Sequence, residues 1–249
     1  MKRTIVALFA AAAMAVPAAA QAQEVLVSAA ASLTEVLQEI AKVYQPRSGS
    51  ALALNFGASN TLARQIAAGA RVDVFISADE AQMDVVAADV VPGTRVDLLS
   101  NQLAIAVPDD RARQFASARD LTAPSIRRIA LGDPAAVPAG VYAKAYLEQI
   151  GLWAALQSKV VPSGSVRLAL AAVENGAADA AIVYRTDIAT AQRARLAFVV
   201  PVAEGPKIVY PAAVMRTGAN LPGARRLLAF LQTPEAIAIF TRAGFLTLK

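Results

Sequence analysis

Short apolar runs alternate with helical patterns along the first part of the chain. Residues 25–28 form an apolar run typical of a strand, and from Leu33 to Tyr44 apolar residues recur at helical spacing. Two more strand-and-helix units follow, with strands expected at residues 52–56 and 72–76 and helices at 62–67 and 83–90. This order predicts a mainly parallel sheet with helices on both faces.

A second series of elements starts at residue 101. We expect strands at residues 101–108, 129–131, 160–161 and 180–184, and helices at 141–150 and 166–173. A further apolar stretch at 208–214 precedes helical patterns at 224–231 and 235–243. Because no flexible linker separates the two series, we expect two α/β lobes between which the chain crosses more than once.

The first 22 residues have the pattern of a secretory signal peptide. Lys2 and Arg3 form a charged start, and residues 5–16 are an apolar run. Ala20-Gln21-Ala22 then supplies the small residues of a cleavage site. A membrane-spanning helix needs about 20 apolar residues, more than this run offers. We therefore expect cleavage after Ala22 and a mature protein in the periplasm.

The chain of 249 residues contains neither cysteine nor histidine. This composition excludes disulfide frameworks, zinc sites built from Cys and His, and Ser-His-Asp or Cys-His catalysis. The sequence also has no S-x-x-K pair, no phosphate-binding loop and no G-x-G-x-x-G motif. Carboxylate acid–base chemistry is the remaining option for an enzyme, and no carboxylate pair at a strand end suggests it. We therefore expect neither catalysis nor a bound cofactor.

The charged residues indicate neither a nucleic-acid surface nor a protein-bound metal. The formal net charge is +5, but Lys and Arg are not clustered or interleaved with aromatic residues. Asp109, Asp110 and the other acidic residues lack the spacing of a calcium-binding loop. We expect no nucleic-acid partner.

Four strand-to-helix junctions are rich in small residues and hydroxyls. They are residues 28–35, 56–62, 132–140 and 162–166. In the first junction Ser32 and Glu35 have the spacing of a capping box, and in the second Ser59 stands where a helix begins. A serine at such a position usually only caps its own helix. Four junctions at the carboxyl ends of strands, however, bring helix N-termini together, and helix N-termini bind anions.

Five segments are recognisable in combination. They are AAASLT at residues 29–34, TLARQI at 61–66, DVFISAD at 73–79, GDP and VPAG within 132–140, and IVY at 182–184. Together they resemble the periplasmic molybdate-binding proteins of bacterial ABC transporters, over a stretch from about residue 25 to Phe245. The resemblance implies the type II periplasmic-binding-protein fold, with two discontinuous α/β lobes and a ligand cleft between them. We expect lobe one to comprise residues 23–100 and 212–249, and lobe two residues 101–211.

The resemblance also implies an anion site made of neutral donors. In this family two serines, two backbone N–H groups and one tyrosine hydroxyl hold the oxyanion. The matching positions here are Ser32, Ser59, Ala139, Val166 and Tyr184. Gly57 and Asn60 stand where serine-rich versions of the second segment occur, so the second serine position could be displaced by one residue. Molybdenum would be bound only as the oxyanion, without a direct protein–metal bond.

The implied function is the capture of molybdate or tungstate by a monomer and its delivery to the membrane permease of an ABC transporter. These two dianions are nearly the same size, so the sequence does not separate them. Another tetrahedral anion, such as sulfate, phosphate or thiosulfate, is an alternative ligand. The same fold also serves as the effector domain of transcription factors. That function would require a helix-turn-helix segment and a cytoplasmic location, whereas this chain starts with the pattern of a signal peptide.

Overall fold

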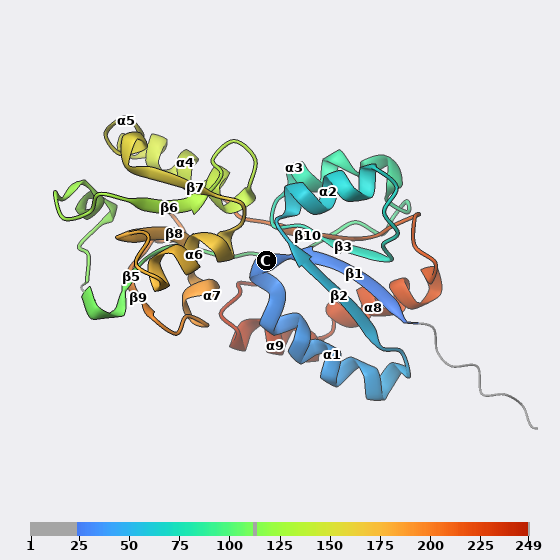
Figure 1. Ribbon diagram of the computed structural model, residues 1–249. Coiled ribbons are helices and arrows are strands. Elements are labelled where there is room, and N and C mark those ends of the chain that lie inside the picture. Colours follow the sequence, from blue (N-terminus) through green and yellow to red (C-terminus); the bar gives the residue numbers. More distant parts are fainter. Residues whose placement is uncertain (1–23, 112–113, 249) are drawn as a thin grey trace, which may run out of the picture.

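The computed structural model describes residues 24–111 and 114–248, so the expected signal peptide lies outside the described residues. Two five-stranded sheets form the centres of two lobes that lie side by side (Figure 1). The strand order in lobe one is β2 (Leu52–Gly57), β1 (Val25–Ala30), β3 (Val74–Ile76), β10 (Tyr210–Val214) and β4 (Val96–Leu99). In lobe two it is β7 (Val160–Ser163), β6 (Ile129–Gly132), β8 (Ala180–Tyr184), β5 (Leu103–Pro108) and β9 (Ala194–Val199). The expected α/β class with two lobes is confirmed.

Helices flank both sheets (Figure 1). Those of lobe one are α1 (Thr34–Ser48), α2 (Ser59–Ala67), α3 (Glu80–Val85), α8 (Leu221–Leu231) and α9 (Pro234–Arg242). Those of lobe two are α4 (Pro138–Gln149), α5 (Trp153–Leu156), α6 (Val166–Glu174) and α7 (Arg185–Ile188). Short 3-10 helices occur at η1 (Ala31–Leu33), η2 (Ala87–Asp89), η3 (Asp109–Arg111), η4 (Ala118–Thr122) and η5 (Gln157–Lys159).

The short strand β3 shows how the sheet of lobe one is covered on both faces. Its side chains alternate between the faces, as the pleat of a strand requires. Val74 and Ile76 pack in the main core, which includes the buried residues of α1, α8 and α9. Phe75 points the other way, into a second cluster with residues of α2 and α3. All three side chains are fully buried, which explains the uninterrupted apolar pattern of this strand.

Each sheet has four strands that run in the same direction and one reversed strand, which fits the mainly parallel sheet expected from the sequence and adds one antiparallel strand to it. In lobe one β1 is parallel to β2 and β3, whereas β10 is antiparallel to β3 and β4. In lobe two β6 is parallel to β7 and β8, whereas β5 is antiparallel to β8 and β9. The antiparallel strands β10 and β5 are the ones that follow a crossing from the other lobe. Strands β4 and β9 were not expected from the sequence.

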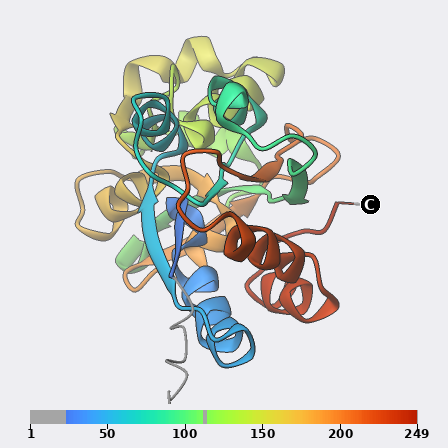
Figure 2. The same ribbon diagram turned by 90° about the vertical axis from the view of Figure 1, so that its right-hand side faces the viewer.

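The chain passes between the sheets at two places among the described residues. The first lies between Leu99 and Leu103, and the second between Val199 and Tyr210. Lobe one therefore combines both ends of the described chain. Figure 2, which faces lobe one, shows the C-terminal helices α8 and α9 close to the N-terminal helix α1, and α1 contacts α9. The expected lobe boundaries, between residues 100 and 101 and between residues 211 and 212, remain a prediction.

The register of the parallel strands places their carboxyl ends together. Ala30 at the end of β1 is opposite Gly57 at the end of β2. In lobe two Gly132 at the end of β6 is opposite Ser163 at the end of β7. The four turns that leave these strands are the four junctions rich in small residues, so each lobe presents two of them at one sheet edge.

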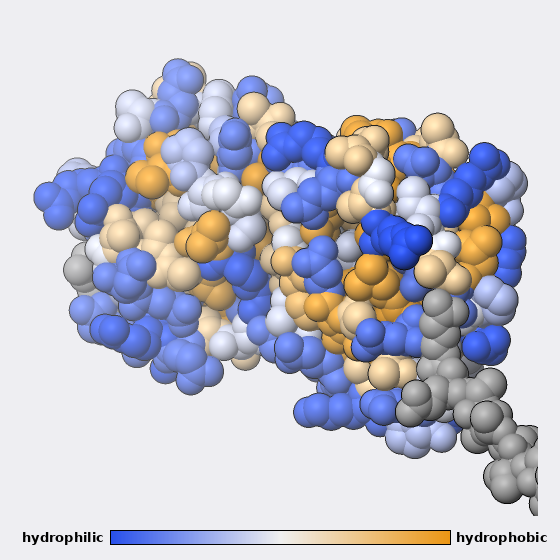
Figure 3. Space-filling view, turned by 45° about the vertical axis from the view of Figure 1, so that its right-hand side comes forward, coloured by the Kyte–Doolittle hydropathy of each residue, from blue (hydrophilic) through white to orange (hydrophobic). Residues whose placement is uncertain are grey.

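Within the described ranges, no helix is long and apolar enough to cross a bilayer. On the face drawn in Figure 3, hydrophilic and hydrophobic residues are interspersed over the surface.

Candidate functional site

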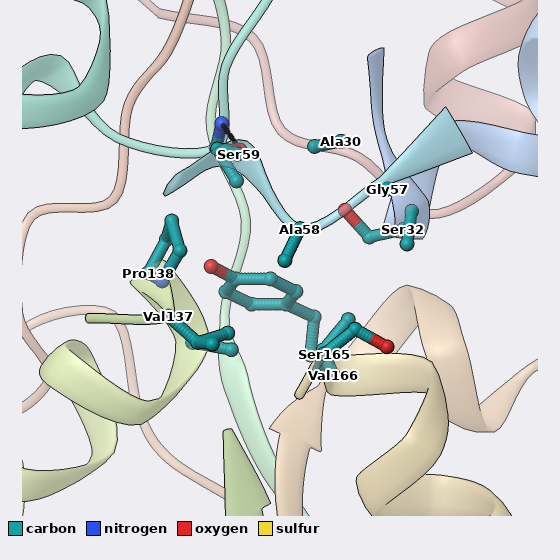
Figure 4. Close-up of a pocket in the computed structure, with 13 residues that line it drawn as sticks. Ala30, Ser32, Gly57, Ala58, Ser59, Val137, Pro138, Ser165 and Val166 are labelled. Carbon is teal, nitrogen blue, oxygen red and sulfur yellow. Dashed lines mark hydrogen bonds between the residues drawn. The ribbon is translucent and has the colours of Figure 1, made fainter. Parts of the chain in front are cut away.

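A pocket between the lobes brings together all five positions expected from the sequence. Lobe one contributes Ser32 and Ser59, and lobe two contributes Ala139, Val166 and Tyr184. Figure 4 shows Ser32 and Ser59 on one side of the pocket, with Val166 across from them. The pocket contains about 230 Å³ of empty space, part of it open to solvent. The volume open to the centres of water-sized spheres is only about 10 Å³, far below the about 300–1,000 Å³ of sites for drug-sized ligands, so this pocket suits a small ion.

The walls of the pocket are the first turns of helices. Helix α2 begins at Ser59 and α6 at Val166, and α4 begins at Pro138, one residue before Ala139. Proline suits this first position because its fixed φ matches a helix and the missing N–H would have no helical partner. The N–H groups of a first helical turn have no acceptor within their helix, and the helix dipole adds partial positive charge there. The pocket therefore attracts anions.

Ser59 presents a free hydroxyl proton. Its Oγ accepts the backbone N–H of Ala78 at 2.9 Å and makes no capping bond, because the N-cap of α2 is Ala58 (Figure 4). A serine oxygen that already accepts one hydrogen bond still has its own proton to donate. Asn60, the neighbour considered as an alternative, is not among the described residues that line the pocket.

The expected capping box of Ser32 and Glu35 is wrong. Ser32 lies in the 3-10 turn η1, the N-cap of α1 is Leu33, and no side chain caps this helix end. The Ser32 Oγ instead lies 3.0 Å from the hydroxyl of Tyr210, and Glu35 pairs with Arg167 of lobe two. Both partners are more than 130 residues away along the chain, so the local spacing gave no sign of them.

Tyr184 has a buried hydroxyl without a partner. The residue is 1% exposed, and its hydroxyl makes no hydrogen bond with any other described residue. Burial raises the pKa of this phenol well above its ordinary value, so the group stays protonated at neutral pH. A buried hydroxyl without a partner costs free energy in the absence of a ligand. Its place in the pocket wall suits a donor to a bound anion.

None of the described residues that line the pocket carries a charged side chain. Arg167 follows Val166 directly, but its guanidinium is held by two carboxylates outside the pocket lining. Its Nε lies 2.7 Å from Oδ1 of Asp187, and its Nη1 donates to Oε1 of Glu35 at 2.9 Å. Burial raises the pKa of Asp187 to about 6, while Arg167 acts in the opposite direction. The pocket thus offers neutral donors, and the cation that follows Val166 is already paired.

Arg167 also joins the lobes beside the pocket. It belongs to α6 of lobe two, as its partner Asp187 belongs to α7. Glu35 belongs to α1 of lobe one, and the carbonyl of Ser32 accepts a hydrogen bond from Arg167 at 3.5 Å. The roles of Arg167, Asp187 and Tyr210 were not expected from the sequence, because each acts through a partner distant in sequence or on another element.

Comparisons with known proteins agree with this geometry. The family model of bacterial extracellular solute-binding proteins matches residues 25–246. The molybdate-binding protein ModA of Escherichia coli is 37% identical, over 98% of this chain and 99% of its own length. ModA of Haemophilus influenzae is 32% identical over 91% of both chains. The structure of the Azotobacter vinelandii periplasmic molybdate-binding protein superposes with a TM-score of 0.83 at 25% identity, covering 91% of this chain and all of that one.

Proposed function

This chain belongs to the family of bacterial extracellular solute-binding proteins, and we propose that its cleft captures molybdate for an ABC transporter, with tungstate as a second ligand. The observation that carries the proposal is the pocket itself, where hydroxyls of both lobes meet, the buried Tyr184 hydroxyl is unpaired, and none of the described lining residues has a charged side chain. The full-length similarity to proteins named for molybdate binding supports the choice of anion.

The proposed site holds the oxyanion through five neutral groups. These are the hydroxyls of Ser32, Ser59 and Tyr184 and the backbone N–H groups of Ala139 and Val166, with further N–H groups of the two serines available. A tetrahedral dianion only accepts hydrogen bonds, so each of its oxygens needs donors when water is removed. Hydrogen bonds to an ionised acceptor are about twice as strong as neutral ones. Several of them, together with helix dipoles, replace the hydration of the anion.

Neutral donors also suit a carrier that must release its ligand. A buried Lys or Arg would add a strong attraction that has to be overcome when the anion passes to the permease. None of the described lining residues has a charged side chain that could act as an acid or a base towards a bound anion, which supports binding without catalysis. We therefore propose that the chain, after loss of residues 1–22, acts in the periplasm as a monomer that delivers its anion to a membrane permease.

Selectivity by size is the test of this function. Sulfate carries the same charge as molybdate but is smaller, so a rigid set of donors spaced for molybdate cannot reach all its oxygens together. We expect tungstate to bind about as tightly as molybdate and sulfate to bind far more weakly. Isothermal titration calorimetry of the wild-type protein with the three sodium salts measures this directly. Sulfate binding as tight as molybdate binding would contradict the proposal.

The ion pair between the lobes should favour the ligand-bound state. An anion that touches both lobes stabilises their closed arrangement, and a contact such as Arg167 to Glu35 adds to it. Because Glu35 is half exposed, the pair is worth about 0.2–1 kcal/mol. Glu35→Gln is therefore expected to weaken molybdate binding by less than about fivefold, and the difference from wild type should shrink at high salt.

Glu39→Gln is the matched control for this prediction. Glu39 lies one helical turn further along α1 and pairs at 2.7 Å with Arg242 of α9, within lobe one. Its removal should leave the dissociation constant for molybdate unchanged. Equal effects of the two variants in calorimetry at low salt would show that the pair between the lobes has no special role.

A further inference from the structure

We infer that Tyr210 and Asn101 are positioning residues that set the direction of the Ser32 hydroxyl, so that Ser32 donates its proton into the pocket. The inference rests on the proposed function and deepens it, because neither residue lines the pocket among the described residues. Asn101, Tyr210 and Ser32 form a chain of hydrogen bonds whose donors and acceptors can be assigned in order.

The first member, Asn101, has a fixed orientation. Its Oδ1 accepts the backbone N–H of Gln102 at 2.8 Å, an interaction that only the amide oxygen can make. Its Nδ2 must therefore be the donor on the other side of the amide. That nitrogen donates to the hydroxyl of Tyr210 at 3.3 Å and to Oγ1 of Thr186 at 2.9 Å.

For the second member, Tyr210, one arrangement satisfies both its oxygen and its proton. Its oxygen accepts from Asn101, and its single proton has to go to an acceptor. The Ser32 Oγ at 3.0 Å is the acceptor that the described part of the chain offers, and Tyr210 is fully buried away from water. Tyr210 therefore donates to Ser32.

The third member, Ser32, keeps its own proton for a ligand. Its oxygen is already used as an acceptor for Tyr210, and Ser32 lines the pocket. A hydroxyl that pointed its proton at Tyr210 would turn a lone pair towards the anion and repel it. A chain of hydrogen bonds running in one direction also polarises the last donor, which strengthens its bond to the anion.

The first two members of this series of hydrogen bonds lie at the places where the polypeptide passes between the lobes. Asn101 lies in the first crossing between β4 and β5, and Tyr210 is the first residue of β10 after the second crossing. Thr186, the other acceptor of Asn101, belongs to α7 of lobe two. The direction of the Ser32 donor is thus set by residues at the connection of the two lobes.

A double-mutant cycle with molybdate as the probe tests this inference. Tyr210→Phe removes the hydroxyl and keeps the ring, which packs 5.8 Å from the ring of Tyr184. We expect molybdate affinity to fall by about 2- to 12-fold, the range for one neutral hydrogen bond. In a Ser32→Ala background the same substitution should change the affinity no further, because there is no hydroxyl left to orient. A purely structural role would produce the same loss in both backgrounds.

Two further variants make the result decisive. Tyr44→Phe removes another buried tyrosine hydroxyl in lobe one, where the ring packs on Phe230, and it should leave the affinity unchanged. Asn101→Ala removes the start of the chain of hydrogen bonds. Its loss of affinity should likewise disappear in the Ser32→Ala background.

Three experimental outcomes would overturn either the inference or the proposed function. Additive losses for both Tyr210→Phe and Asn101→Ala, or wild-type affinity in Tyr210→Phe, would overturn the inference alone. A wild-type protein that does not bind molybdate would overturn the proposed function, and the inference with it.

Discussion

Tyr184→Phe is expected to weaken molybdate binding by about 10- to 150-fold. A hydrogen bond to a charged acceptor contributes about 1.5–3 kcal/mol, and every 1.4 kcal/mol corresponds to about tenfold in affinity. The substitution removes only the hydroxyl, since phenylalanine fills the same buried space. Calorimetric titration of wild type and variant with molybdate measures the loss. Unchanged affinity would remove Tyr184 from the proposed site.

The stability of the ligand-free variant provides the control, because it should not fall. The Tyr184 hydroxyl has no hydrogen-bond partner among the described residues, so its removal relieves a cost instead of breaking a bond. Thermal unfolding without ligand should therefore occur at the same temperature as in the wild type or slightly above it. A lower unfolding temperature would mean that the affinity loss reflects damage to the fold.

Gly140→Ala is expected to destabilise the protein by about 3 kcal/mol or more, at or above the upper end of the usual cost of overpacking. A Cβ at this position would lie 1.9 Å from the carbonyl oxygen of Gly132 and 2.7 Å from that of Asp133. These are backbone atoms, which cannot rotate away, so the start of α4 would have to move off β6. Urea denaturation of the ligand-free protein measures the loss, and molybdate affinity should fall too because Ala139 moves with the helix.

Gly164→Ala is the matched control for Gly140→Ala. Gly164 precedes α6 in the same lobe, and an added Cβ would meet only Leu168 Cδ1 at an ordinary 3.6 Å. This variant should unfold at nearly the same urea concentration as the wild type. If Gly140→Ala also did so, the close approach of α4 to β6 would not matter for the fold.

The five proposed site positions could be predicted because they lie in or beside segments that are recognisable in combination, and the structure brings all five to one pocket. The strand directions could not be predicted in the same way. The apolar residues of β10 predict a buried strand, but an apolar run has no direction, and its antiparallel pairing with β3 depends on where the chain re-enters lobe one. The alternation in β4 and β9 is short and interrupted by exposed residues, so neither strand stood out.

The expected capping box of Ser32 and Glu35 was wrong for a related reason. Ser32 and Glu35 have the correct spacing, yet the structure gives both side chains to partners that only the tertiary fold brings near. Tyr210 lies inside an apolar stretch, where a tyrosine is usually a core residue. Nothing in the local sequence indicates that its hydroxyl faces Ser32. A local motif can mark a position of interest. It does not show which distant residue will form a hydrogen bond or an ion pair with the side chain at that position.

The position of β10 in lobe one has a consequence for the order of folding. Every strand of lobe two lies between Leu103 and Val199, so that sheet can be completed from one continuous stretch. The sheet of lobe one needs Ala212 to pair with Ile76, a contact across more than half of the chain. Closing so long a loop is slow. Lobe two should therefore fold first during synthesis, and lobe one should stay open until β10 and the last helices have emerged.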